Sequence, residues 1–271
     1  MGFQTALAGT LYVSSASTNP ASPFGSWETA ATGIAQAVSA AADGDEVRVS
    51  NGVYGIRDEI RLLSNVDLVS EHGATATVVA ADGGSRCLFM DNTGAVARGF
   101  TLTGGRADFG GGVVCLNGLL VDCIVVSNRA HGVGGGGVYA TGGRIEQCAI
   151  RQNTVRGIGG GGLYVPWGAV VSRCRITANN APGGYGGGAA VSGDGRLENS
   201  LVFENSAVVG GGLFWSGSYT GAGWIAHCTV TRNTGYVGAI YCEGAALARN
   251  TILFDNMDTG GQTTEVMSIT S

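Results

Sequence analysis

The chain has 271 residues, of which 44% are hydrophobic and only 13% are charged, so the sequence can bury a large core and is unlike a disordered segment. Its 15 basic residues are all arginine, and its 20 acidic residues give a net charge of −5, which argues against a general nucleic-acid-binding protein. The 49 glycines lack the strict three-residue period of collagen, and no apolar run reaches the roughly 18 residues of a membrane-spanning helix.

The N-terminal part predicts a short cap followed by less regular coils. Residues 1–10 lack a charged region and a long apolar region, so we interpret them as a tag or a trimmed targeting remnant ahead of one domain over residues 11–271. Residues 26–42 predict a modest amphipathic helix that begins at Ser26 and closes the open end of the core. Residues 43–105 predict irregular early coils.

A repeat dominates residues 106–256, where six units each start with glycines and end in asparagine. The spacing of about 25 residues and the two-residue apolar alternation predict one solenoid coil per unit and about nine parallel-stacked coils in the whole chain. Residues 257–271 then begin a further coil. The closing asparagines are Asn128, Asn153, Asn179, Asn205, Asn233 and Asn256.

Alternation along the coil predicts which columns of residues face the core. Two columns are apolar and predicted to point inward, whereas Arg151 and Thr177 are predicted to face water. The asparagines are predicted to form a stacked ladder at a corner, where asparagine tolerates left-handed backbone angles. The inward columns are Val113, Val138, Leu163, Ala189, Leu213 and Ile240, and Leu120, Ile145, Val171, Leu197, Ile225 and Ala248.

The seven cysteines are an odd number, and four of them share one inward column with Ser200 and Thr251. Parallel side chains cannot converge on a zinc ion, and their Cβ vectors do not face one another for disulfides, so we interpret the four as buried free thiols. The pairing state of Cys87, Cys115 and Cys242 stays open. The four are Cys123, Cys148, Cys174 and Cys228.

Two sets of motifs resemble known families. The pattern GG-[AG]-[ILV] followed by [FILV]-x-x-N, as in VGAIY at Val237 and VFEN at Val202, resembles the repeats of chlamydial polymorphic outer-membrane proteins. A second pattern resembles the start of secreted pectate-lyase-like β-helix proteins. It comprises Trp27, Ala30, Ile34, Ala37, Val38, Gly44, Asp45, Val47, Val49, Gly52 and Tyr54.

The resemblance implies an all-β, right-handed parallel β-helix that is extracellular or on a bacterial cell surface. It implies no single activity, because this superfamily includes lyases, hydrolases and surface proteins. A pectate-lyase-type enzyme would use an arginine or lysine base and clustered carboxylates that hold Ca²⁺, and a hydrolase would need neighbouring aspartates. Calcium is therefore expected only for a lyase, and the sequence shows neither constellation and no zinc-ligand spacing.

The best catalytic candidates are polar residues of neighbouring coils, Arg173 and Arg175 with Asp122 or His227 nearby, although they also fit a solvated face. A second set of candidates is aromatic and could stack on sugar rings or a protein partner, or on one another. These candidate ligand-binding residues are Tyr139, Tyr164, Phe214, Tyr241, Trp167 and Trp215.

The leading functional hypothesis is a secreted or surface-exposed β-helix that acts as an adhesin-like or structural module and binds a polysaccharide or a surface protein on one long face. The second hypothesis is a polysaccharide lyase or glycoside hydrolase. A third is a filament subunit that associates end to end.

Overall fold

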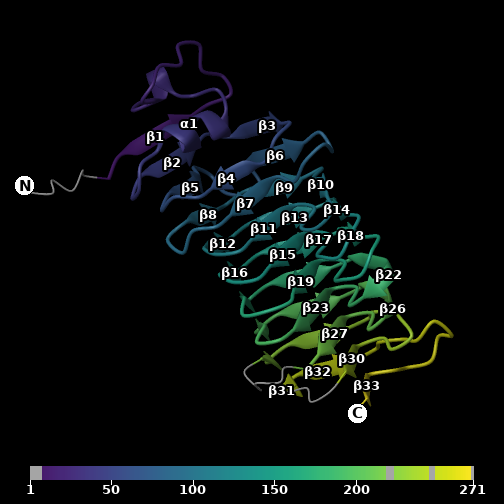
Figure 1. Cartoon of the computed structure of the whole chain (residues 1–271). Helices are drawn as coiled ribbons and strands as arrows, with labels where there is room; N and C mark the ends of the chain where they lie inside the picture. The colour runs from purple at the N-terminus through teal and green to yellow at the C-terminus, as the bar shows by residue number, and fades with distance from the viewer. Residues whose placement is uncertain (1–7, 218–222, 244–247, 270–271) are drawn as a thin grey trace, which may run out of the picture.

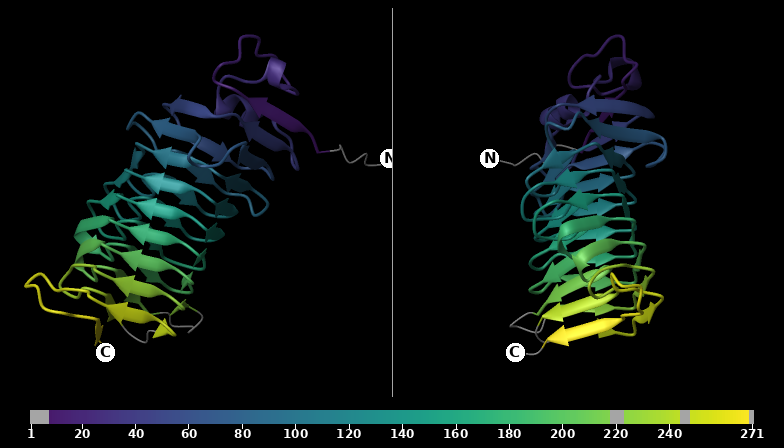
Figure 2. Two further views of the ribbon diagram at one scale, coloured as in Figure 1. Left: turned by 180° about the vertical axis from the view of Figure 1, so that it is seen from behind. Right: turned by 90° about the vertical axis from the view of Figure 1, so that its right-hand side faces the viewer.

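A computed structural model describes residues 8–217, 223–243 and 248–269. Past a short helical region, the chain winds into an elongated stack of coils, with its first and last described strands at opposite ends (Figure 1). The described strands form four sheets, and each sheet takes at most one strand from every coil. The strands of neighbouring coils lie parallel, as the stacked arrows in both views of Figure 2 show. The predicted all-β solenoid of parallel coils is confirmed.

Each coil passes through the sheets in the order A, B, D and C, and both the early coils and the last coils lack a described strand in sheet D. Sheet A contains β1 (Thr10–Val13), β2 (Glu46–Val49), β5 (Asp67–Ser70), β8 (Val96–Arg98), β12 (Leu119–Val121), β16 (Arg144–Glu146), β20 (Val170–Ser172), β24 (Arg196–Glu198), β28 (Trp224–Ala226) and β31 (Ala248–Arg249). Sheet B contains β3 (Gly52–Ile56), β6 (Thr77–Ala81), β9 (Thr101–Thr103), β13 (Ile124–Val126), β17 (Ala149–Arg151), β21 (Arg175–Thr177), β25 (Leu201–Phe203), β29 (Thr229–Thr231) and β32 (Ile252–Phe254). Sheet C contains β4 (Ile60–Leu62), β7 (Leu88–Met90), β11 (Val113–Cys115), β15 (Val138–Ala140), β19 (Leu163–Val165), β23 (Ala189–Ser192), β27 (Leu213–Ser216), β30 (Ile240–Glu243) and β33 (Val266–Ile269). Sheet D contains β10 (Arg106–Ala107), β14 (Arg129–Ala130), β18 (Thr154–Val155), β22 (Asn180–Tyr185) and β26 (Ser206–Val209).

The N-terminal region differs from the prediction of one helix over residues 26–42. It forms a 3₁₀ turn, η1 (Trp27–Thr29), and a separate helix, α1 (Ile34–Ala40), which begins after Gly33 rather than at Ser26. The intervening Ala31 is extended because its backbone pairs with β1, which interrupts the helix. Helix α1 still covers the end of the core, since Ile34 and Ala37 are buried and α1 contacts β1, β2 and β4.

The ends of the chain also refine the predicted boundaries. Residues 1–7 of the predicted tag lie outside the described residues, while Thr10 already starts β1 of sheet A. At the other end, β33 pairs with β30 and extends sheet C, and residues 270–271 are outside the description.

The core follows the predicted inward columns with two corrections. The sheet C column from Val113 to Ile240 is at most 1% exposed, and the sheet A column is buried from Leu120 to Ile225. Ala248, predicted inward, is exposed because it lies in the last described strand of sheet A. Thr177, predicted to face water, is only 9% exposed because it lies between Arg151 and Phe203 on the outer face of sheet B, where neighbouring side chains cover it.

The asparagine ladder is confirmed. All six asparagines are at most 2% exposed, and the Nδ2 of each of the first five donates to the Oδ1 of the next asparagine at 2.9–3.1 Å. Each backbone N–H of those five also donates to the same oxygen. At the end of the ladder, Asn256 Nδ2 donates to Glu265 Oε2 at 2.8 Å. The ladder therefore joins every repeat coil to the next through buried hydrogen bonds.

The left-handed backbone angle predicted for the asparagines occurs instead at the residue before each of them, with φ of 53–58°. A second left-handed residue, with φ of 48–55°, precedes each member of the Cys/Ser/Thr column. Each repeat coil thus turns two corners, and a single left-handed residue stands at each corner. The residues before the asparagines are Ser127, Gln152, Ala178, Glu204, Arg232 and Asp255.

A run of glycines precedes each sheet C strand of the repeat from β11 to β27, at a place where other backbone atoms of the same and the neighbouring coil lie too close for a side chain. A Cβ at Gly160 would overlap the carbonyl oxygen of Leu163, and a Cβ at Gly162 would collide with the amide of Asn179. Glycine is therefore required here by space, because the coil bends tightly beside the buried ladder.

Candidate functional site

The corner between sheets A and B is made by the second set of left-handed residues. Their side chains point outward in one polar row that runs along the stack, with φ near +50° in every coil. Asparagine, aspartate and histidine are enriched in this conformation, so the backbone alone explains part of the polar composition. The row contains Asp122, Gln147, Arg173, Asn199, His227 and Asn250.

Directly behind this row, the Cys/Ser/Thr column points into the core. The thiol of Cys148 donates to the carbonyl of Glu146 at 3.1 Å, and the hydroxyl of Ser200 donates to the carbonyl of Glu198 at 2.7 Å. The same bond, from the side chain to the carbonyl two residues earlier, recurs at Cys123, Cys174, Cys228 and Thr251. These residues are therefore more than small apolar fillers, because their X–H groups donate at every corner.

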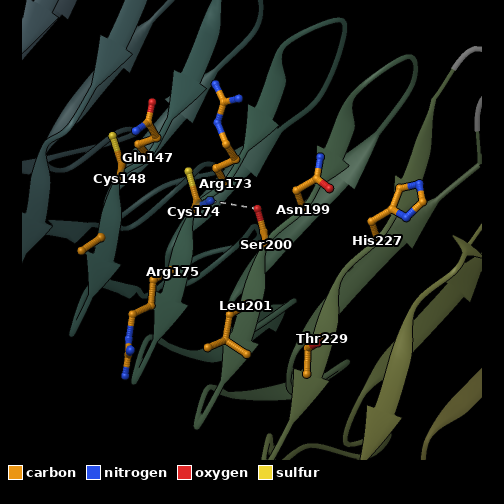
Figure 3. Close-up of a pocket in the computed structure, with 11 residues that line it drawn as sticks. Gln147, Cys148, Arg173, Cys174, Arg175, Asn199, Ser200, Leu201, His227 and Thr229 are labelled. Atoms are coloured by element: carbon orange, nitrogen blue, oxygen red, sulfur yellow. Dashed lines mark hydrogen bonds between the residues drawn. The ribbon is translucent and has the colours of Figure 1, made fainter.

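An open groove of about 620 Å³ follows this corner over four coils (Figure 3). One wall is the polar row from Gln147 to His227, and the opposite wall is formed by residues at the start of the sheet B strands. Cys148, Cys174 and Ser200 lie between the two walls. In Figure 3, Arg173 and Arg175 point to opposite sides of the groove. The second wall contains Ala149, Arg175, Leu201 and Thr229.

The groove brings together three of the four predicted catalytic candidates, Arg173, Arg175 and His227, all of which are exposed. Asp122 does not line it; this residue lies farther along the row and forms an ion pair with Arg98 at 3.6 Å. The prediction missed Gln147 and Asn199, although both occupy the same sequence position relative to the cysteine column.

The charge of the groove is positive. Arg173 Nη2 lies 2.6 Å from Glu146 Oε2. Glu146 is buried, does not line the groove and shares its charge with a second arginine, Arg144. The guanidinium of Arg175 lies over the Phe203 ring at 4.6 Å, which fixes its position. The groove lining itself contains no aspartate or glutamate.

The calcium site expected of a lyase does not fit the residues that the structure describes. Across residues 8–217, 223–243 and 248–269, no group of three or more His, Cys, Asp or Glu side chains could hold a metal ion. The groove presents guanidinium, amide and hydroxyl groups, whereas Ca²⁺ takes carboxylate and carbonyl oxygens.

All seven cysteines are buried and unpaired, which answers the question left open for Cys87, Cys115 and Cys242. Burial raises the pKa of Cys87 and Cys115 to about 12, and that of Cys228 and Cys242 to about 11. These four thiols are therefore protonated near neutral pH, which makes them poor nucleophiles and poor metal ligands.

The predicted aromatic row exists on the outer face of sheet C, but its rings pack on one another. Tyr139 and Tyr164 have centroids 5.8 Å apart, as do Phe214 and Tyr241. Tyr139, Tyr164 and Tyr241 are half-buried and Phe214 is buried. Rings from outside the column, Phe109 on Tyr139 and Tyr185 on Phe214, cover both pairs.

The two tryptophan candidates have opposite environments. Trp167 is 60% exposed, whereas Trp215 is 1% exposed and points into the core, so the prediction of Trp215 as a ligand-binding residue is wrong. Trp215 follows the outward Phe214 by one residue, and the two-residue alternation alone would have placed it inside.

The comparisons agree with this fold. A family model described as the right-handed β-helix region matches residues 111–270, and the chain belongs to this family. The structure is similar to pectate lyase Pel9A, with a TM-score of 0.59 and 12% identity over 97% of this chain and 78% of that chain. It is also similar to a pectin methylesterase in complex with hexasaccharide VII, with a TM-score of 0.52 and 15% identity over 97% and 89% of the two chains.

A pectin methylesterase from Aspergillus niger is similar at a TM-score of 0.50 and 12% identity, over 98% of this chain and 92% of that chain. At these identities the likeness shows the fold alone. No protein with a curated description matches the sequence. The described part of the chain contains no helix with the length and apolar character needed to cross a membrane.

Proposed function

We propose that this protein is a secreted or cell-surface β-helix that binds an acidic polysaccharide in the groove between sheets A and B. The observation that carries the proposal is a continuous groove over four coils with two exposed arginines and no carboxylate in its lining. Guanidinium groups match the carboxylate geometry of uronate sugars, and they bind such groups through paired, charge-assisted hydrogen bonds.

The shape of the groove suits a chain rather than a compact ligand. Equivalent residues of successive coils are about 4.8 Å apart. A polymer lying along the stack would therefore meet Gln147, Arg173, Asn199 and His227 in turn. Amide and imidazole groups can hydrogen-bond to sugar hydroxyls between the charged contacts.

The groove favours binding over hydrolysis. Glycoside hydrolysis normally requires two carboxyl groups that flank the scissile bond. The lining has none, and the nearby Glu198 is engaged with Trp224 Nε1 at 2.7 Å. Among proteins of similar fold, one is a pectate lyase and another is described with a bound hexasaccharide, which supports a saccharide ligand.

A lyase remains the second candidate because the groove presents arginines, which could act as a base. A self-stacking filament is the third candidate. Both are separable from simple binding, since a lyase releases unsaturated products that absorb ultraviolet light and a filament sediments as a polymer.

The test is a binding titration with polygalacturonate oligosaccharides, with neutral galactan as the reference ligand. The double variant Arg173→Gln, Arg175→Gln should bind polygalacturonate at least about tenfold more weakly, because two charge-assisted contacts are lost. Glutamine already occupies the Arg173 position in the preceding coil, so the backbone accepts it. Arg151→Gln, on the same sheet but outside the groove, is the matched control.

Three results would contradict the proposal. Equal binding by the double variant and the native protein would exclude the groove as the site. Equal affinity for galactan would exclude recognition of the acid group, and unsaturated products in the presence of Ca²⁺ would show that the protein is a lyase. If the protein is located outside the cell as proposed, it should be found in the culture medium or be cleaved by protease that is added to intact cells.

A further inference from the structure

Three arginines cluster on the outer face of sheet D, on the other side of sheet B from the groove. Arg106 and Arg129 are direct neighbours in the pairing of β10 with β14. Arg156 follows one coil later, two residues beyond Thr154, which pairs with Arg129. Three guanidinium groups from three successive coils therefore share one small area of a protein whose net charge is −5.

These arginines lack the carboxylate partner that about half of the arginines have. Among the residues that the structure describes, none of the three forms an ion pair, whereas the adjacent Arg86 Nε lies 2.7 Å from Glu59 Oε2. The Nε of Arg129 is buried and has no hydrogen-bond partner in the described structure. The Arg129 side chain is otherwise only half-buried, and an anion beside it would supply the acceptor that this nitrogen lacks.

The electrostatics of Arg129 support this conclusion. Partial burial, together with the positive charges of Arg156 and Arg106, lowers the pKa of Arg129. An anion placed among the three groups would relieve this repulsion and supply the missing acceptor.

The surroundings leave room for a ligand. A hollow of about 430 Å³ beside the cluster is lined by Arg106, Arg86, His131 and Ser85. Two carboxylates also line this hollow. Glu59 forms ion pairs with Arg86 and Arg61, whereas Asp108 makes no ion pair among the described residues. Arg86 and Arg106 balance these two carboxylates, so the excess positive charge beside the hollow comes from Arg129 and Arg156, which do not line it.

We propose that Arg106, Arg129 and Arg156 form a second ligand site, which binds the tetrahedral oxyanion of a sulfate or phosphate ester. A tetrahedral group offers several oxygens in different directions and can accept from all three guanidinium groups, whereas one planar carboxylate offers two. The outward column continues beyond Arg129 with Thr154, Asn180 and Ser206, which can donate to further oxygens of a polymeric ligand. The site is independent of the proposed groove.

The experiment is a binding titration in Tris chloride with dextran sulfate, polyphosphate and polygalacturonate, with unmodified dextran as the reference. The native protein should bind at least one of the first two polymers, and the preference between them shows whether the site favours sulfate or phosphate groups. Arg129→Gln should weaken that binding roughly tenfold or more, because one charge-assisted bidentate contact is lost. Inorganic sulfate should raise the Tm of the native protein more than the Tm of this variant.

Two controls keep the test specific. Arg249→Gln makes the same change of charge at an exposed arginine in β31 of sheet A, away from sheet D, and it should bind like the native protein. The groove variant Arg173→Gln, Arg175→Gln should also retain the sulfate effect. Unchanged binding by Arg129→Gln, an equal loss in Arg249→Gln, or binding of polygalacturonate alone would overturn the proposal.

Discussion

Asn179 Oδ1 accepts two hydrogen bonds from Asn153, one from its backbone N–H at 3.0 Å and one from its side-chain Nδ2 at 3.0 Å. Asn179 itself repeats both bonds to Asn205 in the following coil. Because all three residues are buried, no water can replace a missing partner.

Replacing Asn179 by alanine should therefore destabilise the protein more than a typical surface change. The variant leaves two buried donors of Asn153 without an acceptor, which costs about 2–5 kcal/mol in the free energy of unfolding. Guanidinium unfolding followed by circular dichroism measures the loss. Asn180→Ala, an exposed neighbour, should cost less than about 0.5 kcal/mol, and equal losses for the two variants would contradict the role of the ladder.

The contribution of the corner thiols to stability can be tested by replacing the Cys174 thiol with a hydroxyl donor or with no donor. Cys174→Ser should be tolerated, at a cost below about 1.5 kcal/mol, because Ser200 makes the equivalent bond in the next coil. Cys174→Ala removes the donor as well as volume and should cost about 1 kcal/mol more than the serine variant. Chemical unfolding of both variants measures the two losses in the free energy of unfolding. A serine variant that is less stable than the alanine variant would show that the hydrogen bond contributes nothing and that only apolar volume matters.

Alkaline pH should weaken the fold through the buried thiols. The pKa of Cys115 is raised from an ordinary 9.0 to about 12, so above pH 9 the unfolded chain loses this proton while the folded chain keeps it. The contribution is complete below pH 9 and declines up to about pH 12. Cys115→Ala, which copies Ala140 of the same column, should show a shallower decline between pH 8.5 and 10.5 than the native protein. Parallel curves for the two proteins would refute this linkage.

The left-handed corners predict a stabilising substitution. Ala178 has φ of 53°, which costs an alanine about 1–2 kcal/mol relative to the right-handed region, whereas glycine adopts it freely. Ala178→Gly should therefore raise the free energy of unfolding by about 0.5–1 kcal/mol. Ala149→Gly in strand β17 should lower it. A loss of stability in Ala178→Gly would show that the corner is not strained.

The sequence was sufficient to predict the repeating part of the fold because its information is local and recurs in every coil. The buried asparagines and the inward column from Val113 follow from fixed spacing and two-residue alternation. The α1 region was harder, because Ala31 pairs with β1, and a contact between distant segments overrides the helical pattern.

The candidate sites were only partly predictable for the same reason. The meeting of Arg173, Arg175 and His227 depends on how sharply the chain turns between sheets A and B, which the left-handed residues determine. The residues that hold the left-handed angle at this corner stand one position before the Cys/Ser/Thr column, and side chains such as Gln147 and Arg173 carry no signal for it. The unpaired state of Arg129 could be recognised only once its neighbours were placed.

The asparagine ladder also has an electrical direction. Every side-chain amide donates toward the next coil, so the amide dipoles add along the stack much as peptide dipoles add along a helix. The positive end of this row lies at Asn256, where the carboxylate of Glu265 accepts the last N–H. A negative charge thus stands where the summed dipole favours one, and Glu265 serves the ladder as an acidic residue in the first turn serves a helix.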